Sequence, residues 1–162
     1  MTDHALYEAV QAEIAKYPSR RAAILPALRL AQEKYGWLSP EALEAVAEAI
    51  DYSPAFCQSV ASFYDMFFLE PVGAHVIDIC TNLACALRGA GDVMDAFEDA
   101  LGVRAGETTA DGTITLRKVE CLGGCGWAPV VAVDERYHEH FRPEDAAALV
   151  AEVRARPGGQ HG

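Results

Sequence analysis

Apolar side chains recur at helical spacing through the first seventy residues. Four stretches show this spacing and are predicted to be helices: residues 6–17, 21–35, 40–50 and 54–67. Pro18 ends the first stretch and Gly36 ends the second. The serine–proline pairs Ser39-Pro40 and Ser53-Pro54 supply an N-cap and a first helical residue for the other two. We therefore expect an all-α N-terminal helical bundle.

The pattern changes after a short linker at residues 70–73. The expected order is then a strand at 75–79, a helix at 88–101, strands at 113–119, 130–133 and near 137–138, and a last helix from Pro143. This order suits one sheet with helices packed against it, as in an α/β thioredoxin-like domain of about four strands and two helices. We expect an N-terminal four-helix unit over residues 1–72, the thioredoxin-like domain over 73–156, and a frayed tail over 157–162.

Composition and charge limit the class of protein. Of the 162 residues, 51% are apolar, which is enough to build a core. The net charge of −11 argues against a nucleic-acid partner, because phosphates are neutralised by Lys and Arg. The apolar stretches are too short to span a membrane, and residues 1–5 lack a basic region followed by an apolar one. We expect a cytoplasmic protein without direct membrane insertion, able to dock onto the cytoplasmic face of a membrane complex.

The chain has five cysteines, and four of them form two close pairs. Cys80 and Cys85 follow the first expected strand, and Cys121 and Cys125 follow the second. Loops at strand ends can bring four thiols together. Structural disulfides are not expected in a reducing compartment, so metal binding or redox chemistry is favoured. The fifth, Cys57, occupies an apolar position on the fourth helix and is expected to be a small core residue.

Spacing alone leaves two interpretations of the pairs open. A thioredoxin-type enzyme needs C-x-x-C at the start of a helix, and neither pair has that spacing. Structural zinc accepts pairs separated by two to four residues. A [2Fe–2S] cluster also takes four thiolates, with less uniform spacing.

The surroundings of the cysteines favour the iron–sulfur interpretation over zinc. Neither loop contains a histidine, and Gly123, Gly124 and Gly126 can turn their amides toward sulfur. The same glycines are also compatible with a tight turn that binds no metal. An apolar shell that limits water is expected from Leu83, Ala84, Leu122, Trp127, Ala128 and Pro129.

The chain shows no nicotinamide site of its own, since no G-x-G-x-x-G lies between a strand and a helix. His75, His138 and His140 are expected to be ordinary strand or surface residues. Glu120 precedes Cys121 directly, and we expect its carboxylate to help hold a cluster potential low. An aromatic group at the end of the fourth helix is expected to be core or a domain or subunit contact: Phe63, Tyr64, Phe67 and Phe68.

The two cysteine loops resemble the ligand loops of the thioredoxin-like [2Fe–2S] ferredoxin family, particularly the small E-type subunits of respiratory complex I, NADH:quinone oxidoreductase. The resemblance rests on Cys80, Cys85, Cys121 and Cys125, with Ala128-Pro129 after the last. Other segments resemble the family in order, from about residue 12 to 155: 17–18, 23–28, Gln32, 36–39, 63–67, 71–73, 87–90, 106–109 and 111–112. Ser62, Cys57 and Trp127 depart from the usual family residues without removing a ligand.

The resemblance implies one [2Fe–2S] cluster, with Cys80, Cys85, Cys121 and Cys125 as its ligands and no catalytic residue in this chain. It also implies a partner subunit that binds FMN, NADH and a [4Fe–4S] cluster, within the peripheral arm of complex I. The expected role is electron transfer as a subunit of NADH dehydrogenase. Two alternatives remain: the diaphorase module of a soluble NAD-linked hydrogenase or formate dehydrogenase, and a zinc-stabilised interaction module.

Overall fold

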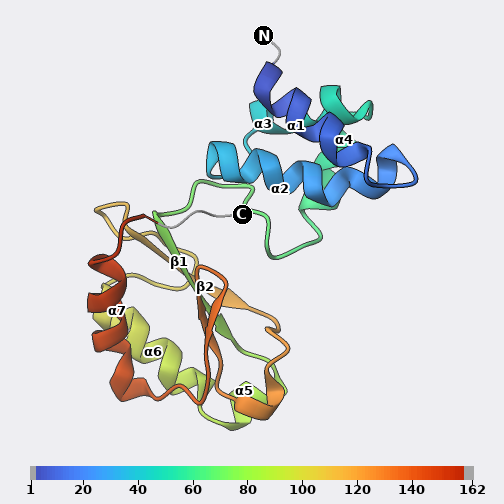
Figure 1. Ribbon diagram of the computed structural model, residues 1–162. Coiled ribbons are helices and arrows are strands. Elements are labelled where there is room, and N and C mark those ends of the chain that lie inside the picture. Colours follow the sequence, from blue (N-terminus) through green and yellow to red (C-terminus); the bar gives the residue numbers. More distant parts are fainter. Residues whose placement is uncertain (1–2, 159–162) are drawn as a thin grey trace. The chain divides into compact units, whose positions relative to one another are not determined.

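The computed structural model describes residues 3–158, which divide into two compact units, residues 3–71 and 72–158 (Figure 1). Of the frayed tail expected at 157–162, residues 159–162 lie outside the described part. Within residues 3–158, no helix is long and apolar enough to cross a membrane.

The N-terminal unit is helical throughout. Its elements are α1 (His4–Ile14), the short 3-10 helix η1 (Arg20–Ala23), α2 (Ile24–Tyr35), α3 (Pro40–Ile50) and α4 (Pro54–Ala61). The hydroxyls of Ser39 and Ser53 accept hydrogen bonds from the amides of Ala42 and Phe56, as expected of N-caps. Gly36 ends α2 with a φ of +79°, a conformation that glycine adopts without strain. The predicted bundle, the two serine caps and the glycine stop are therefore confirmed. The first helix is shorter than predicted: α1 ends at Ile14, and the amides of Lys16 and Tyr17 bond to carbonyls three residues earlier, in turns that precede Pro18.

The predicted end of the fourth helix at Phe67 is wrong, because α4 ends at Ala61. The buried amide of Gln32 is the reason. Its nitrogen donates to the carbonyl of Met66 at 2.8 Å, and its oxygen accepts from the amide of Phe68 at 2.7 Å. These two bonds hold the segment after α4 outside a helix, with the side chain of Phe67 buried. Phe63, expected in the core or at a contact, is 81% exposed.

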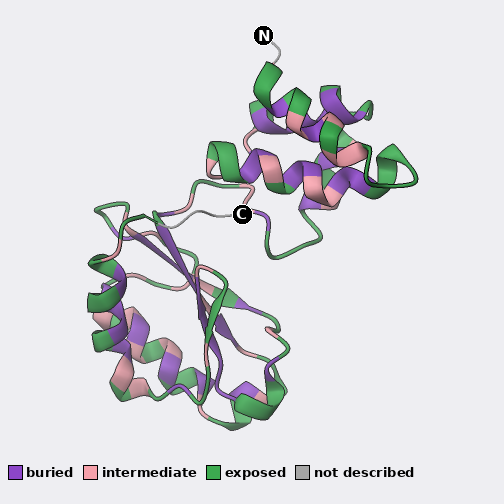
Figure 2. Cartoon of the chain, viewed as in Figure 1, coloured by how far each residue is buried: buried purple, intermediate pink, exposed green. Residues whose placement is uncertain are grey.

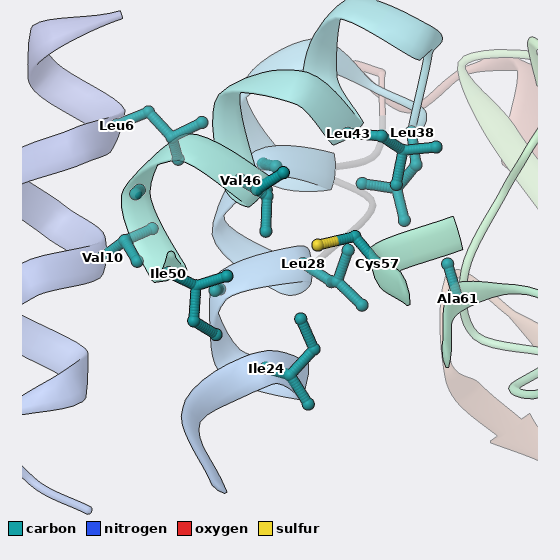
Figure 3. Packing of buried hydrophobic residues seen from close by; sticks show 14 of the residues in the cluster. Leu6, Val10, Ile24, Leu28, Leu38, Leu43, Val46, Ile50, Cys57 and Ala61 are labelled. Carbon is teal, nitrogen blue, oxygen red and sulfur yellow. The ribbon is translucent and has the colours of Figure 1, made fainter. Parts of the chain in front are cut away.

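Cys57 lies in the core of the N-terminal unit, as predicted. Its sulfur is surrounded by aliphatic side chains of the neighbouring helices, including Leu28 and Val46 (Figure 3). It has no exposed surface, and burial raises the pKa of its thiol to about 11. The thiol is therefore protonated and inert at neutral pH.

The second unit is a four-stranded sheet with helices. Its elements are β1 (His75–Cys80), α5 (Leu83–Leu87), α6 (Ala90–Leu101), β2 (Ile114–Val119), η2 (Cys125–Trp127), β3 (Val131–Val133), β4 (Arg136–His138), η3 (Pro143–Asp145) and α7 (Ala146–Arg154). The strand order is β2-β1-β3-β4, with β1 and β2 parallel and the other pairs antiparallel. The predicted α/β class and strand order along the chain are confirmed. The short helix α5 was not predicted.

One face of this sheet packs against α6 and α7, which lie side by side in Figure 1. Alternate strand residues such as Ile77, Leu116 and Val131 point into that core. The buried side chain of Phe97 packs against them from α6. The buried strands stand out against exposed outer helix faces in Figure 2. On the opposite face, Asp78 and Arg117 lie in register and form an ion pair of 2.8 Å between Oδ1 and Nε.

Two ends of the sheet are fixed in different ways. At one end, Asp134 in the β3–β4 turn contacts Nδ1 of buried His75 at 2.7 Å and accepts from the amide of Val76 at 2.9 Å. His75 is thus a strand residue, as predicted, and holds the hairpin to β1. At the other end, Cys80 and Val119 close the parallel strands β1 and β2 in register. Both cysteine loops therefore leave the sheet at one end.

Candidate metal centre

The structure brings the four paired cysteines together at this end of the sheet. Cys80 is the last residue of β1 and Cys85 lies in α5; both are 3% exposed. Cys121 follows β2 and Cys125 begins η2, and both are exposed. All four are free thiols. The Cys80 thiol lies within hydrogen-bonding reach of the thiols of Cys85 and Cys121. Cys125 is near enough to Cys85 to act on it electrostatically.

Backbone amides point at these sulfurs from both loops. Burial acts to raise the pKa of the Cys80 thiol. The amides of Asn82 and Leu122, together with the thiols of Cys85 and Cys121, outweigh burial, and the pKa lies below its ordinary value. Burial raises the pKa of Cys85, against the amide of Val130. Amides directed at sulfur stabilise negative charge there, which is the environment a thiolate ligand needs.

The two glycines between Cys121 and Cys125 are needed for different reasons. Gly123 has a φ of +75°, and its amide donates to Sγ of Cys121 at 3.3 Å. Gly124 is buried, and a Cβ at this position would lie 2.8 Å from Cγ2 of Val130. The predicted inward turn of the amides is observed at Gly123. The turn therefore needs glycine at position 123 for its positive φ and at position 124 because there is no room for a Cβ.

The apolar shell predicted around the cysteines is only partly present. Ala128 and Pro129 are buried, and Ala84 and Leu122 are partly buried. Leu83 is 70% exposed and Trp127 is 52% exposed, so the prediction is wrong for these two. The geometry of α5 is the reason for Leu83. Cys85 faces inward, so Leu83 and Leu87, four residues apart, share the opposite, outer face.

The donor set fits an iron–sulfur cluster. Within the part of the chain that the structure describes, no group of three or more His, Cys, Asp or Glu side chains is arranged to hold a single metal ion. A [2Fe–2S] core spreads its four thiolates over two irons, so its requirement is two neighbouring pairs. Cys80, Cys85, Cys121 and Cys125 provide such pairs, with amides directed at sulfur.

Sequence reasoning missed three contributors to the site. Asn82 caps α5 by accepting from the amide of Leu83 at 2.8 Å, and an asparagine before Leu-Ala is a recognisable N-cap signal. Tyr137 donates from its hydroxyl to the carbonyl of Leu122 at 2.6 Å. The third is the amide of Val130. No local pattern marks the last two, because the fold alone brings them to the loops.

Three further residues that the sequence singled out lie near strand ends. His138 is the last residue of β4, while Glu120 follows β2 and His140 follows β4. Glu120 is exposed, between β2 and Cys121. His138 is partly buried in β4, and burial lowers its pKa. The backbone amide of exposed His140 donates to the carbonyl of Trp127 at 2.7 Å, beside η2. The two histidines are therefore strand and surface residues, as expected.

A thioredoxin-like sheet with paired cysteines in loops at one end defines a class of small ferredoxin-type proteins. The family described as thioredoxin-like [2Fe–2S] ferredoxin matches residues 10–154, and the chain belongs to this family. The expected resemblance is thereby confirmed over almost the whole chain.

Named relatives agree with the family, and a solved structure shares the fold. The chain is 40% identical over 148 residues to the E 2 subunit of NADH-quinone oxidoreductase from Rhizobium meliloti, covering 91% of this chain and 88% of that protein. It is 42% identical over 144 residues to "NADH-quinone oxidoreductase subunit 2" of Thermus thermophilus, covering 87% and 80%. A crystal structure of NAD+-reducing [NiFe]-hydrogenase aligns with a TM-score of 0.69 and 21% identity, covering 80% of this chain and 22% of that one, which shows a shared fold.

Proposed function

We propose that this chain is the [2Fe–2S] electron-transfer subunit of the NADH-oxidising arm of an NADH:quinone oxidoreductase. Its cluster would be held by Cys80, Cys85, Cys121 and Cys125. The observation that supports this most strongly is the group of four thiols with amides directed at sulfur. Membership of the family and about 40% identity to NADH-quinone oxidoreductase subunits support the assembly.

The protein's own groups would perform three tasks. The ends of β1 and β2 fix the two loops relative to each other, since these strands pair over their whole length. The amides of Leu122, Gly123 and Val130 would stabilise the negative charge on the thiolates. When bound, a [2Fe–2S] cluster accepts and returns a single electron. The exposed side, at Cys121 and Cys125, would face the electron partner, while Cys80 and Cys85 anchor the buried side.

The partner in this proposal is a subunit that binds FMN, NADH and a [4Fe–4S] cluster, and the FMN exchanges single electrons with this chain. The other neighbours would be subunits of the peripheral arm at the cytoplasmic face of the inner membrane. Catalysis on NADH would take place in the flavin subunit. This separation of NADH oxidation from electron transfer fits a chain whose candidate functional residues are the cysteines of one site.

Co-purification from the native host tests the proposed assembly. An affinity-tagged chain is isolated under mild detergent and its companions are identified by mass spectrometry. We expect a flavin-containing NADH-binding subunit together with membrane subunits of a quinone reductase. A flavin subunit accompanied by hydrogenase or formate dehydrogenase subunits would contradict the quinone-reductase assignment and favour a soluble diaphorase module.

A further inference from the structure

The peptide group between Leu122 and Gly123 lies between two partners from distant parts of the unit. Its carbonyl oxygen accepts a hydrogen bond of 2.6 Å from the hydroxyl of Tyr137. Its N–H, which belongs to Gly123, donates to Sγ of Cys121 at 3.3 Å. One peptide plane therefore links the hydroxyl of Tyr137, through the carbonyl of Leu122 and the amide of Gly123, to the sulfur of Cys121.

The sheet places Tyr137 for this contact. Tyr137 lies in the edge strand β4 and pairs with Ala132, which in turn pairs with Asp78. This register puts its side chain on the face away from the α6–α7 core, because side chains alternate along a strand. From there the hydroxyl reaches the loop that connects β2 to β3, fifteen residues earlier in the chain. The ring is 46% exposed, so burial of the ring does not explain its position.

This peptide requires an external contact to fix its orientation. Gly123 has no Cβ and tolerates both signs of φ, so the peptide before it can flip at little cost. The hydrogen bond from Tyr137 selects the orientation in which the amide of Gly123 points at sulfur. A hydrogen bond to a carbonyl also polarises the peptide and strengthens its N–H as a donor. Both effects act on the sulfur of Cys121.

We propose that Tyr137 is a positioning residue that holds the Leu122–Gly123 amide on the sulfur of Cys121 and thereby raises the reduction potential of the cluster. The inference rests on the proposed function, because it takes Cys121 as a cluster ligand. Reduction adds a negative charge to the site, and hydrogen bonds to the sulfurs are among the determinants of cluster potential. An amide held on sulfur stabilises the reduced form more than the oxidised form.

The test is a redox titration of the cluster-loaded protein, followed by EPR, for wild type and Tyr137→Phe. The variant keeps the ring and loses the hydroxyl. We expect a lower midpoint, with the ratio of oxidised to reduced cluster at a fixed potential rising by about threefold to tenfold, where tenfold corresponds to about 59 mV. Tyr17→Phe, which removes a hydroxyl from the N-terminal unit, is the matched control and should leave the midpoint unchanged.

A second variant keeps the proposal testable if Tyr137→Phe fails to retain the cluster. Incorporation of 3-fluorotyrosine at position 137 preserves the ring and makes the hydroxyl a stronger donor, so the midpoint should rise. Pulsed EPR after exchange into D2O should show a deuteron coupling that weakens in Tyr137→Phe. An unchanged midpoint in a variant that carries a normal cluster would overturn the role of Tyr137 and leave the proposed function standing. A wild-type protein without a [2Fe–2S] signal would instead overturn the proposed function.

Discussion

Gly124 and Val130 are packed so closely that any side chain at position 124 would collide with the valine. A Cβ there would lie 2.8 Å from Cγ2 of Val130, which is itself buried. Valine has a stiff χ1 angle and cannot turn its methyl group away easily. The contact joins the loop of Cys121 and Cys125 to the residue whose amide points at Cys85.

This contact predicts a rescue experiment. Gly124→Ala should lower the free energy of unfolding by about 1–3 kcal/mol, as overpacking does, and reduce the cluster content of purified protein. The double variant Gly124→Ala with Val130→Ala should recover part of both losses, because the colliding methyl groups are gone. Gly126→Ala is the control, since a Cβ at 126 meets nothing within 4 Å. Equal losses in Gly124→Ala and Gly126→Ala would contradict the steric explanation.

Cys57 should be chemically silent and dispensable for the cluster. Burial raises its pKa to about 11, so its reactive thiolate form is scarce at pH 8. Iodoacetamide labelling followed by mass spectrometry should leave Cys57 unmodified in the folded protein and modify it in denaturant. Cys57→Ala should retain the full reduced-state EPR signal and lose about 1 kcal/mol of stability. Loss of the EPR signal in this variant would show that the ligand set is wrong.

Asp111 should contribute a pH-dependent part of the stability. The hydroxyl of Thr109 and then the amide of Thr113 lower the pKa of this carboxyl to about 2. A pKa that is lower in the folded than in the unfolded state gives stability that is complete above about pH 4 and is lost as the pH falls toward 2. Urea unfolding from pH 5 to pH 2 should therefore show a shallower decline in Asp111→Asn than in wild type. Glu44→Gln, on an exposed part of α3, should follow the wild-type curve.

Glu120 should make reduction of the cluster less favourable. Its exposed carboxylate lies between β2 and Cys121 and opposes the extra negative charge. Glu120→Gln should raise the midpoint, and the difference should shrink at high salt because exposed charges are screened. Asp99→Asn, near the far end of α6, serves as the control of equal charge change. A midpoint that does not differ from wild type at low salt would remove this role.

The sequence predicted those parts of the fold that local chemistry decides. Ser39 and Ser53 mark helix starts through bonds to amides three residues away, and Gly36 marks an end. The end of α4 could not be predicted in this way. It depends on Gln32, whose amide bonds Met66 and Phe68 more than thirty residues later. Such a contact exists only after the helices have packed.

At the candidate site, too, features set by local sequence were predicted and features set by contacts between distant residues were not. Paired cysteines and glycines indicated the loops, their chemistry and the amide directed at sulfur. The outer position of Leu83 was missed, because apolar character does not reveal which face of the five-residue helix α5 turns inward. The exposure of Trp127, at the end of η2, was missed as well. Tyr137 was missed because strand register, rather than sequence distance, brings its hydroxyl to Leu122.

The most direct test is the metal content and EPR spectrum of anaerobically purified protein, compared for wild type, Cys80→Ser and Cys121→Ser. We predict that the wild type contains iron and acid-labile sulfide in equal amounts and gives a [2Fe–2S] signal when reduced. Either serine variant should weaken or abolish that signal, because a thiolate ligand is lost. A colourless wild-type protein that contains zinc and no acid-labile sulfide would contradict the assignment of these cysteines to an iron–sulfur cluster.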